Sequence, residues 1–259
     1  MISIIDTHIH FDDDRFDTDR APIYTNALNT GVSHMIIPAT TRARWSKIFS
    51  LTKQYANIHP TAGLHPVFVN DHSEEDLHLL DTTLQNNKCV AVGECGLDGF
   101  VKNLDYEKQR YFFTHQIELA AKHKLPMIIH ARNAVEDVTL AIKSANGNVT
   151  GVVHSYNGSL QQAQQLIDLG FLLSFGGAIT YNRATRLRKI VKQLPVEAIM
   201  VETDAPDQPT QANTGNRNEP AFIGEVVSAI AEIKGLEPED IAEASNANAI
   251  RLFKLPQTL

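Results

Sequence analysis

The chain has 259 residues, 43% of them hydrophobic, so it can bury a large core and has about the usual length of one large α/β domain. It contains no apolar run near the ~20 residues that cross a bilayer and no leader before its first apolar segment, so we expect one cytoplasmic domain over residues 1–259 without a membrane partner. The formal net charge of −7 argues against a broad basic surface, so any nucleic acid must be held locally.

Short apolar segments recur along the chain and predict eight β-strands. These segments are residues 2–5, 35–38, 60–63, 89–93, 126–129, 151–153, 171–175 and 198–201. Several of them lack polar alternation, which is typical of parallel strands covered on both faces.

Helical spacing is clearest in two of the intervening stretches. Residues 106–123 carry apolar side chains three or four positions apart, and residues 159–169 do the same between a capping Ser159 and a terminating Gly170. Strands that alternate with helices predict parallel βα units. Because no glycine-rich dinucleotide motif follows the first strand, eight such units favour a (β/α)8 TIM barrel over a doubly wound sheet.

The only two cysteines, Cys89 and Cys95, lie in or beside one predicted strand. Neighbouring positions on a short strand do not easily form a disulfide, so we expect two reduced thiols.

Polar residues follow several predicted strands. Those that could hold a metal are His8, His10, Glu94, His130, His154 and Asp204. In a barrel the carboxyl ends of the strands meet at one face, so ligands far apart in the chain converge there. His8 and His10 are two positions apart at a strand end and can share one cation, although an isolated pair of this kind is more often structural.

Burying so many ionisable groups together without a cation would be costly. Imidazole and carboxylate ligands suit Zn, Mn, Fe, Ni or Co, and Mg also fits if water and substrate phosphate complete its shell. The sequence therefore predicts a centre of divalent cations whose identity the ligands alone do not decide.

Six motifs make the chain resemble the TatD-like metal-dependent deoxyribonucleases and hydrolases of the amidohydrolase superfamily. They are DTHIHFDD at residues 6–13, GLHP at 63–66, GECGLD at 93–98, HAR at 130–132, VVHSYNGS at 152–159 and ETDAP at 202–206. They follow the order of the family from the first strand to the last, so the resemblance covers essentially the whole chain.

This resemblance implies two adjacent divalent cations. His8, His10, Glu94 and Asp204 would hold one of them, and Glu94, His130 and His154 would hold the other. Cys95 is a departure from the EIGLD that is frequent in the family, without consequence for the neighbouring carboxylate.

The implied mechanism is attack by a metal-activated water on a phosphodiester. Asp204 would accept the proton of that water as general base, whereas without the resemblance it could simply cap the following segment.

Further residues are candidates for binding the substrate or for orienting a ligand. Arg132 can hold a phosphate oxygen, with a surface ion pair as the alternative, and His65 can donate to a substrate oxygen. Glu202 is expected to orient a ligand, and Asp6 and Asp98 either do the same or brace turns.

A basic cluster in residues 181–192 is either a phosphate-binding part of the rim or a solvated helix face. From this region and the long polar loop after the last strand, Arg183 and Arg217 are the predicted substrate contacts.

Three functions compete. The first is a metal-dependent phosphodiesterase acting on DNA ends; the second uses the same metal site on a small phosphoester, amide or lactone. The third is a non-catalytic binding barrel with structural zinc. Structural zinc sites are usually closed by four protein ligands, so a position left open for water on each cation argues against this third function. No obligate protein partner is evident.

Overall fold

The structure is a computed structural model that describes residues 2–145 and 149–256. The chain divides into two compact units. The terminal unit comprises Met1–Ile37, Tyr55–Ile58 and Leu173–Leu259, and the central unit comprises Pro38–Gln54 and His59–Leu172. Within the described residues, no helix is long and apolar enough to cross a membrane.

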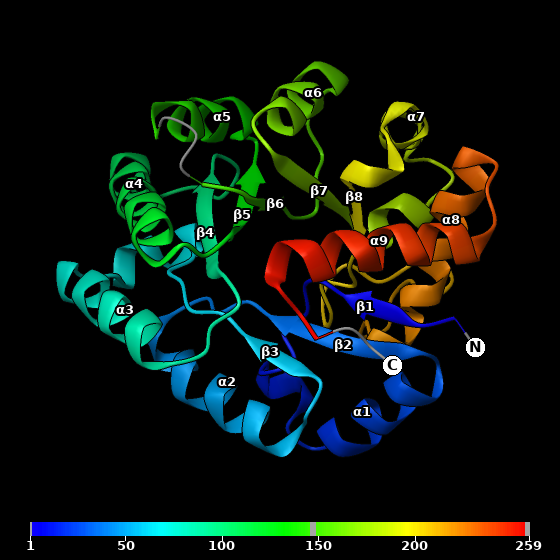
Figure 1. Cartoon of the computed structure of the whole chain (residues 1–259), viewed down its shortest axis with the longest axis horizontal. Helices are drawn as coiled ribbons and strands as arrows, with labels where there is room; N and C mark the ends of the chain where they lie inside the picture. Colours follow the sequence, from blue (N-terminus) through cyan, green and yellow to red (C-terminus); the bar gives the residue numbers. More distant parts are fainter. Residues whose placement is uncertain (1, 146–148, 257–259) are drawn as a thin grey trace. The chain divides into compact units, whose positions relative to one another are not determined.

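Strands and helices alternate along the described chain (Figure 1). The strands are β1 (Ile4–Asp6), β2 (Val32–Ile37), β3 (Ile58–Pro60), β4 (Val92–Asp98), β5 (Met127–Arg132), β6 (Gly151–Val153), β7 (Phe171–Phe175) and β8 (Ile199–Val201). The α-helices are α1 (Arg20–Asn29), α2 (Arg42–Gln54), α3 (Glu74–Asn86), α4 (Tyr106–His123), α5 (Val135–Ser144), α6 (Leu160–Asp168), α7 (Thr185–Gln193), α8 (Ile223–Lys234) and α9 (Pro238–Phe253). Short 3-10 helices are η1 (Asp14–Phe16), η2 (Pro66–Asp71), η3 (Gly177–Thr180), η4 (Val196–Ala198) and η5 (Pro220–Phe222).

Parallel strands form the core of the terminal unit. β1 pairs with β2, and the end of β7 pairs with β8 from Leu173 to Phe175. Helix α9 packs on β1 and β8 and also contacts α8 (Figure 1). Asn246 of α9 accepts the backbone N–H of Ile5 and donates to the carbonyl of Ser3. Its side-chain amide therefore supplies hydrogen-bond partners to backbone groups in and just before β1.

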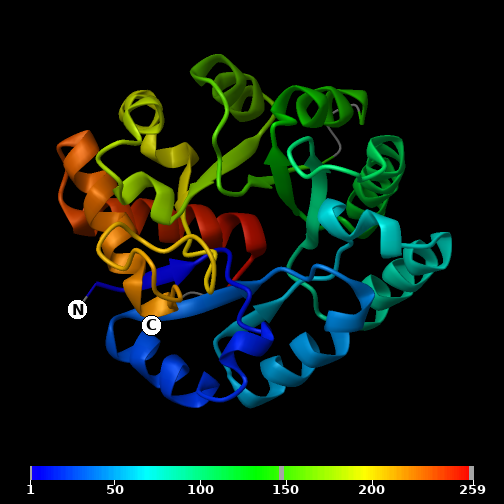
Figure 2. The same ribbon diagram turned by 180° about the vertical axis from the view of Figure 1, so that it is seen from behind.

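The central unit is built on β4, β5 and β6, which pair in parallel in that order. Helix α4 covers β4, and η2 lies beside both (Figure 2). Two buried glutamines of α4 satisfy loop backbone: Gln109 bonds both the N–H and the carbonyl of Asp98, and Gln116 does the same for Leu64. The segments that end two strands are thereby fixed by one helix.

The helices predicted from spacing are confirmed. Helix α4 has the predicted limits, and Asp105 caps it through the N–H of Lys108. Helix α6 begins after Ser159, whose side chain accepts the N–H of Gln162, and Gly170 after it has the left-handed φ of +83°. The basic segment 181–192 includes α7, in which Leu187, Ile190 and Val191 are the buried positions.

The limits of several predicted strands were wrong. Residues 60–63 share only Pro60 with β3, and residues 89–93 cover only the start of β4. β4 continues through polar and glycine positions to Asp98, and β5 continues to Arg132. The prediction followed apolar residues alone, so it ended each strand too early where buried polar side chains with hydrogen-bond partners continue it. Glu94, His130 and Arg132 consequently lie within strands, not after them.

Cys89 and Cys95 are both buried and form no disulfide within the described residues, as predicted. Burial raises the pKa of the Cys89 thiol to about 12 and that of Cys95 well above its usual range. Both thiols therefore stay protonated and pack as small apolar side chains.

Candidate metal-binding clusters

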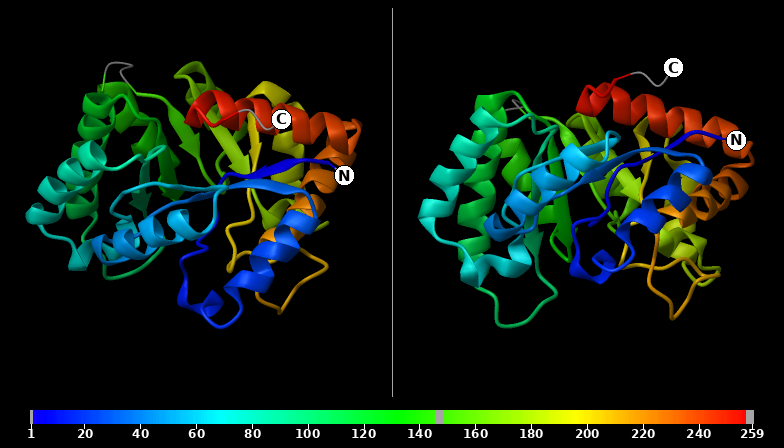
Figure 3. Two further views of the ribbon diagram at one scale, coloured as in Figure 1. Left: turned by 60° about the horizontal axis from the view of Figure 1, so that its bottom comes forward. Right: turned by 90° about the horizontal axis from the view of Figure 1, so that it is seen from below.

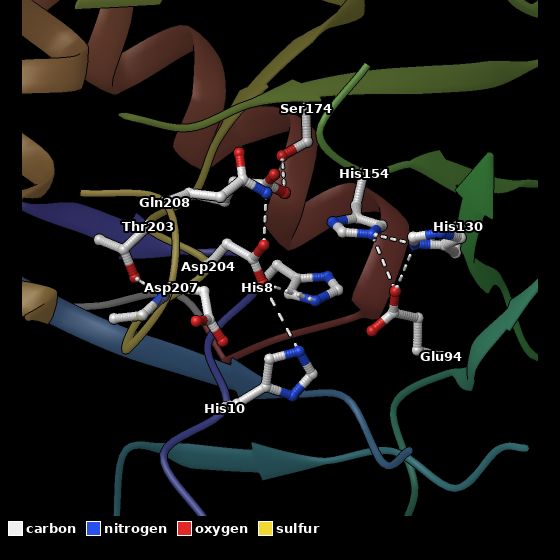
Figure 4. A network of polar contacts seen from close by, with 12 residues as sticks. His8, His10, Glu94, His130, His154, Ser174, Thr203, Asp204, Asp207 and Gln208 are labelled. Atoms are coloured by element: carbon white, nitrogen blue, oxygen red, sulfur yellow. Dashed lines mark hydrogen bonds and ion pairs between the residues drawn. The ribbon is translucent and has the colours of Figure 1, made fainter. Parts of the chain in front are cut away.

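The terminal unit brings His8, His10 and Asp204 together (Figure 4). The Nε2 atoms of both histidines lie 3.5 Å from Oδ1 of Asp204. The two imidazole rings stand edge to face with centroids 5.1 Å apart. His8 and Asp204 are buried and His10 is half-buried, so one carboxylate oxygen faces two imidazole nitrogens in a largely dry setting.

Backbone hydrogen bonds position this cluster. The N–H of Asp204 donates to the carbonyl of His8, and the N–H of His10 donates to the carbonyl of Ala205, each at 2.9 Å. Asp204 itself has a left-handed backbone with φ of 56°, which aspartate tolerates better than most residues. The segment after β1 and the segment after β8 therefore hold each other in a ladder that carries all three side chains.

Asp6 braces the same two segments. Its carboxylate accepts the N–H and the hydroxyl of Thr203, at 3.0 and 2.6 Å, and the N–H of His8 at 3.3 Å. Burial raises its pKa to about 7 against the opposing effect of these hydrogen bonds. The contacts with Thr203 fit the expectation that Asp6 braces a turn, and the contact with the N–H of His8 fits the expectation that it orients a ligand.

Two further polar contacts flank Asp204. Gln208 donates to Oδ2 of Asp204, which leaves Oδ1 as the atom that faces the histidines. Glu202 is fully buried and accepts the hydroxyl of Ser174. Glu202 thus lies two residues from Asp204, anchored to β7.

The long loop after β8 lies beside the segment after β1 (Figure 3), and ion pairs join the two. Arg15 bonds both carboxylate oxygens of Asp207, at 2.9 and 2.7 Å, and also pairs with Asp13. Arg217 pairs with Asp19 at 2.6 Å and with Glu219 at 3.1 Å. The predicted role of Arg217 in binding substrate stays a prediction, but its guanidinium is engaged by two carboxylates.

The central unit gathers imidazoles around Glu94. Oε1 of Glu94 lies 2.8 Å from Nε2 of His154, 3.0 Å from Nε2 of His65 and 3.2 Å from Nδ1 of His130. Nε2 of His154 and Nδ1 of His130 are 3.3 Å apart. Glu94 is 1% exposed, so a single buried carboxylate oxygen faces three imidazole nitrogens.

His65 is oriented as a hydrogen-bond donor. Its Nδ1 accepts the N–H of Val67 at 3.0 Å, at the start of η2. The neutral ring therefore carries its proton on Nε2, which faces Glu94. A ligand role through Nε2 would require the ring to lose that proton, so donation to an oxygen is the better-supported role.

His130 is fixed by a second carboxylate. Its Nε2 lies 2.8 Å from Oδ2 of Asp98, and Oδ1 of Asp98 accepts the N–H groups of Phe100 and Val101. Burial opposes ionisation of Asp98, but these hydrogen bonds lower its pKa to about 2. The proton of His130 is thereby held on Nε2, and Nδ1 is left facing Glu94 and His154.

Gly96 explains how β4 and β5 approach so closely at this point. Its φ is +130°, and a Cβ there would lie 2.1 Å from the carbonyl oxygen of His130. The glycine of the GECGLD motif therefore lets the strand that carries Glu94 lie directly against the strand that carries His130.

The donor sets fit divalent cations. Ligand atoms ~2.1 Å from an ion lie ~3.0–3.4 Å from one another in octahedral or tetrahedral geometry. The separations among Glu94, His130 and His154 are 2.8 to 3.3 Å, and those from Asp204 to His8 and His10 are 3.5 Å. The nitrogen and carboxylate donors are also the types that metals such as Zn and Mn accept.

The predicted substrate contacts lie in two places. Arg132 is exposed, and its guanidinium stacks on the ring of Phe100 at 3.7 Å. In the terminal unit, Arg183 is exposed and lies 5.0 Å from the ring of Tyr181. Whether either arginine contacts substrate stays a prediction.

Sequence reasoning missed several contributors. Gln208 and Ser174 carry no motif, and Asp98 was left undecided between two roles. The aspartate does have a signal, because it ends the GECGLD motif four residues beyond Glu94 on the same strand.

Comparisons with known proteins identify the family. The model for TatD related DNases matches residues 5–254. The metal-dependent hydrolase YjjV of Escherichia coli K12 is 35% identical over 254 residues, which are 97% of this chain and 98% of the relative. The 3′-5′ ssDNA/RNA exonuclease TatD of Erwinia billingiae is 29% identical over 261 residues, covering 98% of this chain and all of the relative.

The fold prediction is confirmed by a solved relative. The crystal structure of Escherichia coli YjjV, a TatD homologue, covers 98% of this chain and 98% of its own, with a TM-score of 0.94 at 34% sequence identity. The parallel α/β arrangement of the described strands agrees with the (β/α)8 class. The chain therefore belongs to the TatD family of metal-dependent hydrolases.

Proposed function

We propose that this enzyme hydrolyses phosphodiester bonds of DNA, acting at strand ends with two divalent cations. The observation that carries the proposal is the trio of donor atoms from Glu94, His130 and His154, which lie 2.8 to 3.3 Å apart. The nuclease activity named for the Erwinia billingiae relative supports the choice of substrate. We also propose that the chain acts in the cytoplasm as one catalytic domain.

The proposed ligands follow the two clusters. His8, His10 and Asp204 would hold one cation, and Glu94, His130 and His154 would hold the other. When bound, the cations would lower the pKa of a water and neutralise negative charge on the phosphodiester.

The protein side chains have separate roles in this proposal. Asp204 accepts the proton of the attacking water, with Gln208 holding the carboxylate through Oδ2. His65 presents its Nε2 proton to an anionic substrate oxygen. Asp98 keeps the proton of His130 on Nε2, and Glu202 anchors the segment of Asp204 through Ser174.

The test begins with chelator-stripped protein reloaded with Mg²⁺, Mn²⁺ or Zn²⁺. It should degrade an end-labelled single-stranded oligonucleotide, and Asp204→Asn should lower the rate at least a hundredfold without unfolding the protein. Glu243→Gln, at an exposed carboxylate of α9, is the matched control and should retain activity.

Hydrolysis of small phosphoesters, amides or lactones by a metal-loaded protein that leaves DNA intact would contradict the proposed substrate. It would instead support the alternative class of small-metabolite hydrolase. Loss of all turnover on chelation would exclude the non-catalytic alternative.

A further inference from the structure

Two exposed phenylalanines stand beside the Glu94 cluster in the central unit. Phe68 is 40% exposed and follows His65 by three residues, and Phe100 is 51% exposed and follows Asp98 by two. Single exposed aromatic side chains are common on protein surfaces. What distinguishes these two is that each is connected by direct contacts to a residue of the candidate active site.

The ring of His65 contacts both Phe68 and the buried carboxylate of Glu94. Its ring centroid lies 5.9 Å from that of His65, whose ring in turn lies 4.6 Å from that of His130. The short helix η2 that carries Phe68 is fixed, because Nε2 of His72 lies 3.0 Å from the carbonyl oxygen of His65 and the N–H of Phe68 donates to the same carbonyl. Phe68 thus presents a half-exposed phenyl face from a well-held segment.

Phe100 forms a stacked pair with Arg132. The guanidinium carbon lies 3.7 Å from the ring centroid, which is the distance of two planar groups in contact. Arg132 follows His130 by two positions on β5, so both side chains leave the same face of the strand. The N–H of Gly99 donates to the carbonyl of Arg132, and the N–H of Phe100 donates to Asp98.

Asp98 couples the stacked pair to the candidate metal ligand. One of its oxygens receives the N–H groups that begin the Phe100 loop, and the other faces Nε2 of His130. The loop is joined to η2 as well, since Asn70 donates to the carbonyl of Asn103. Both aromatic side chains are therefore held in fixed relation to the same cluster.

We propose that Phe68 and the Phe100–Arg132 pair are stacking platforms for the bases of the nucleotides that flank the scissile phosphate. This proposal rests on the proposed nuclease function. Aromatic and guanidinium faces stack on any base, so they select for unpaired nucleotides without reading sequence. A base pair inside a duplex has its faces covered by its neighbours, so the platforms would favour frayed or single-stranded ends.

The experiment compares two single-stranded thymidine oligonucleotides that differ only at their ends. One has normal bases throughout, and the other carries abasic sugars at the last two positions of both ends. Because loss of one base–aromatic stack costs on the order of tenfold in binding, Phe100→Ala and Phe68→Ala should each lower kcat/KM on the normal strand about tenfold. On the abasic strand, each variant should change kcat/KM less than twofold.

Two further variants separate stacking from a general effect on folding. Phe100→Tyr keeps an aromatic face and should retain kcat/KM on the normal strand. Tyr111→Ala removes an exposed aromatic side chain of α4 and should alter neither strand's cleavage. Bound metal, measured per mole of protein, should be the same in all variants.

If the wild-type protein cleaves the normal and the abasic oligonucleotide equally well, the proposal of stacking platforms is refuted, while the nuclease proposal stays intact. The same conclusion would follow if Phe68→Ala and Phe100→Ala slowed cleavage of both strands to the same extent. Wild-type protein that cleaves neither strand in any metal-loaded form would overturn the proposed function itself.

Discussion

Replacing Asp98 with asparagine should weaken metal binding, because it would favour the tautomer of His130 that carries its proton on Nδ1 instead of Nε2. Asparagine can still accept the N–H groups of Phe100 and Val101 through its oxygen, so the loop should keep its conformation. Its amide N–H would then face Nε2 of His130, where the aspartate oxygen now lies 2.8 Å away. The imidazole can avoid that clash of donors only by rotating or by moving its proton to Nδ1, the atom that faces Glu94.

The expected loss is tenfold to a hundredfold in metal affinity, which corresponds to ~1.4–2.8 kcal/mol. Removal of one charge-assisted hydrogen bond is worth ~1.5–3 kcal/mol, so the two lines of reasoning agree. The measurement is competition between the protein and a chromophoric chelator for Zn²⁺ or Mn²⁺. Asp105→Asn is the matched control, because asparagine also caps a helix and Asp105 accepts the N–H of Lys108 at the start of α4. Equal affinity in Asp98→Asn and wild type would refute the tautomer argument.

Three further predictions concern stability. Gly96→Ala, which would place its Cβ 2.1 Å from the carbonyl oxygen of His130 at a φ of +130°, should cost at least ~2 kcal/mol in urea unfolding; an unchanged midpoint would contradict the close strand contact. Asp76→Asn should cost about 1 kcal/mol at pH 7, and the difference should shrink progressively as the pH falls below about 4. Burial opposes ionisation of Asp76, but hydrogen bonds from Ser73 and Arg42 lower its pKa. Its contribution is therefore present above the unfolded pKa and is lost as the pH falls through the lowered folded-state pKa; a difference that does not decrease between pH 7 and strongly acidic pH would argue against this. Arg15→Ala should cost no more than ~1 kcal/mol, because Arg15 is about half exposed, and the cost should shrink in 1 M salt if ion pairs are its source.

The sequence was sufficient for the class of fold, and it named the side chains that gather in the two candidate metal-binding clusters. Helix α4 could be placed to the residue because a capping aspartate, an apolar period and a basic last turn all agree. His8, His10 and Asp204 meet in the terminal unit because the carboxyl ends of β1 and β8 lie together, as the order of strands and helices implied.

The limits of the strands and the contacts that support the candidate clusters could not be predicted from the sequence. β4 contains Gly93 and Gly96 on either side of Glu94, which read as a break in an apolar segment. The backbones of the two glycines nevertheless pack against the neighbouring strand with no room for a Cβ atom. The ion pair of Arg217 with Asp19 could not be predicted either, because the two residues are 198 positions apart and a local pattern holds no information about such a pair.

Asp6 has a consequence for how the protein is made. Its carboxylate bonds Thr203, which is 197 positions later in the chain, and these contacts lie directly beside His8 and Asp204. On the ribosome, the first two histidines must therefore wait until nearly four-fifths of the polypeptide has emerged before their partner segment exists. Glu94, His130 and His154 are separated by no more than 60 positions, so the candidate metal-binding cluster in the middle of the chain can assemble while the one built from its two ends is still incomplete.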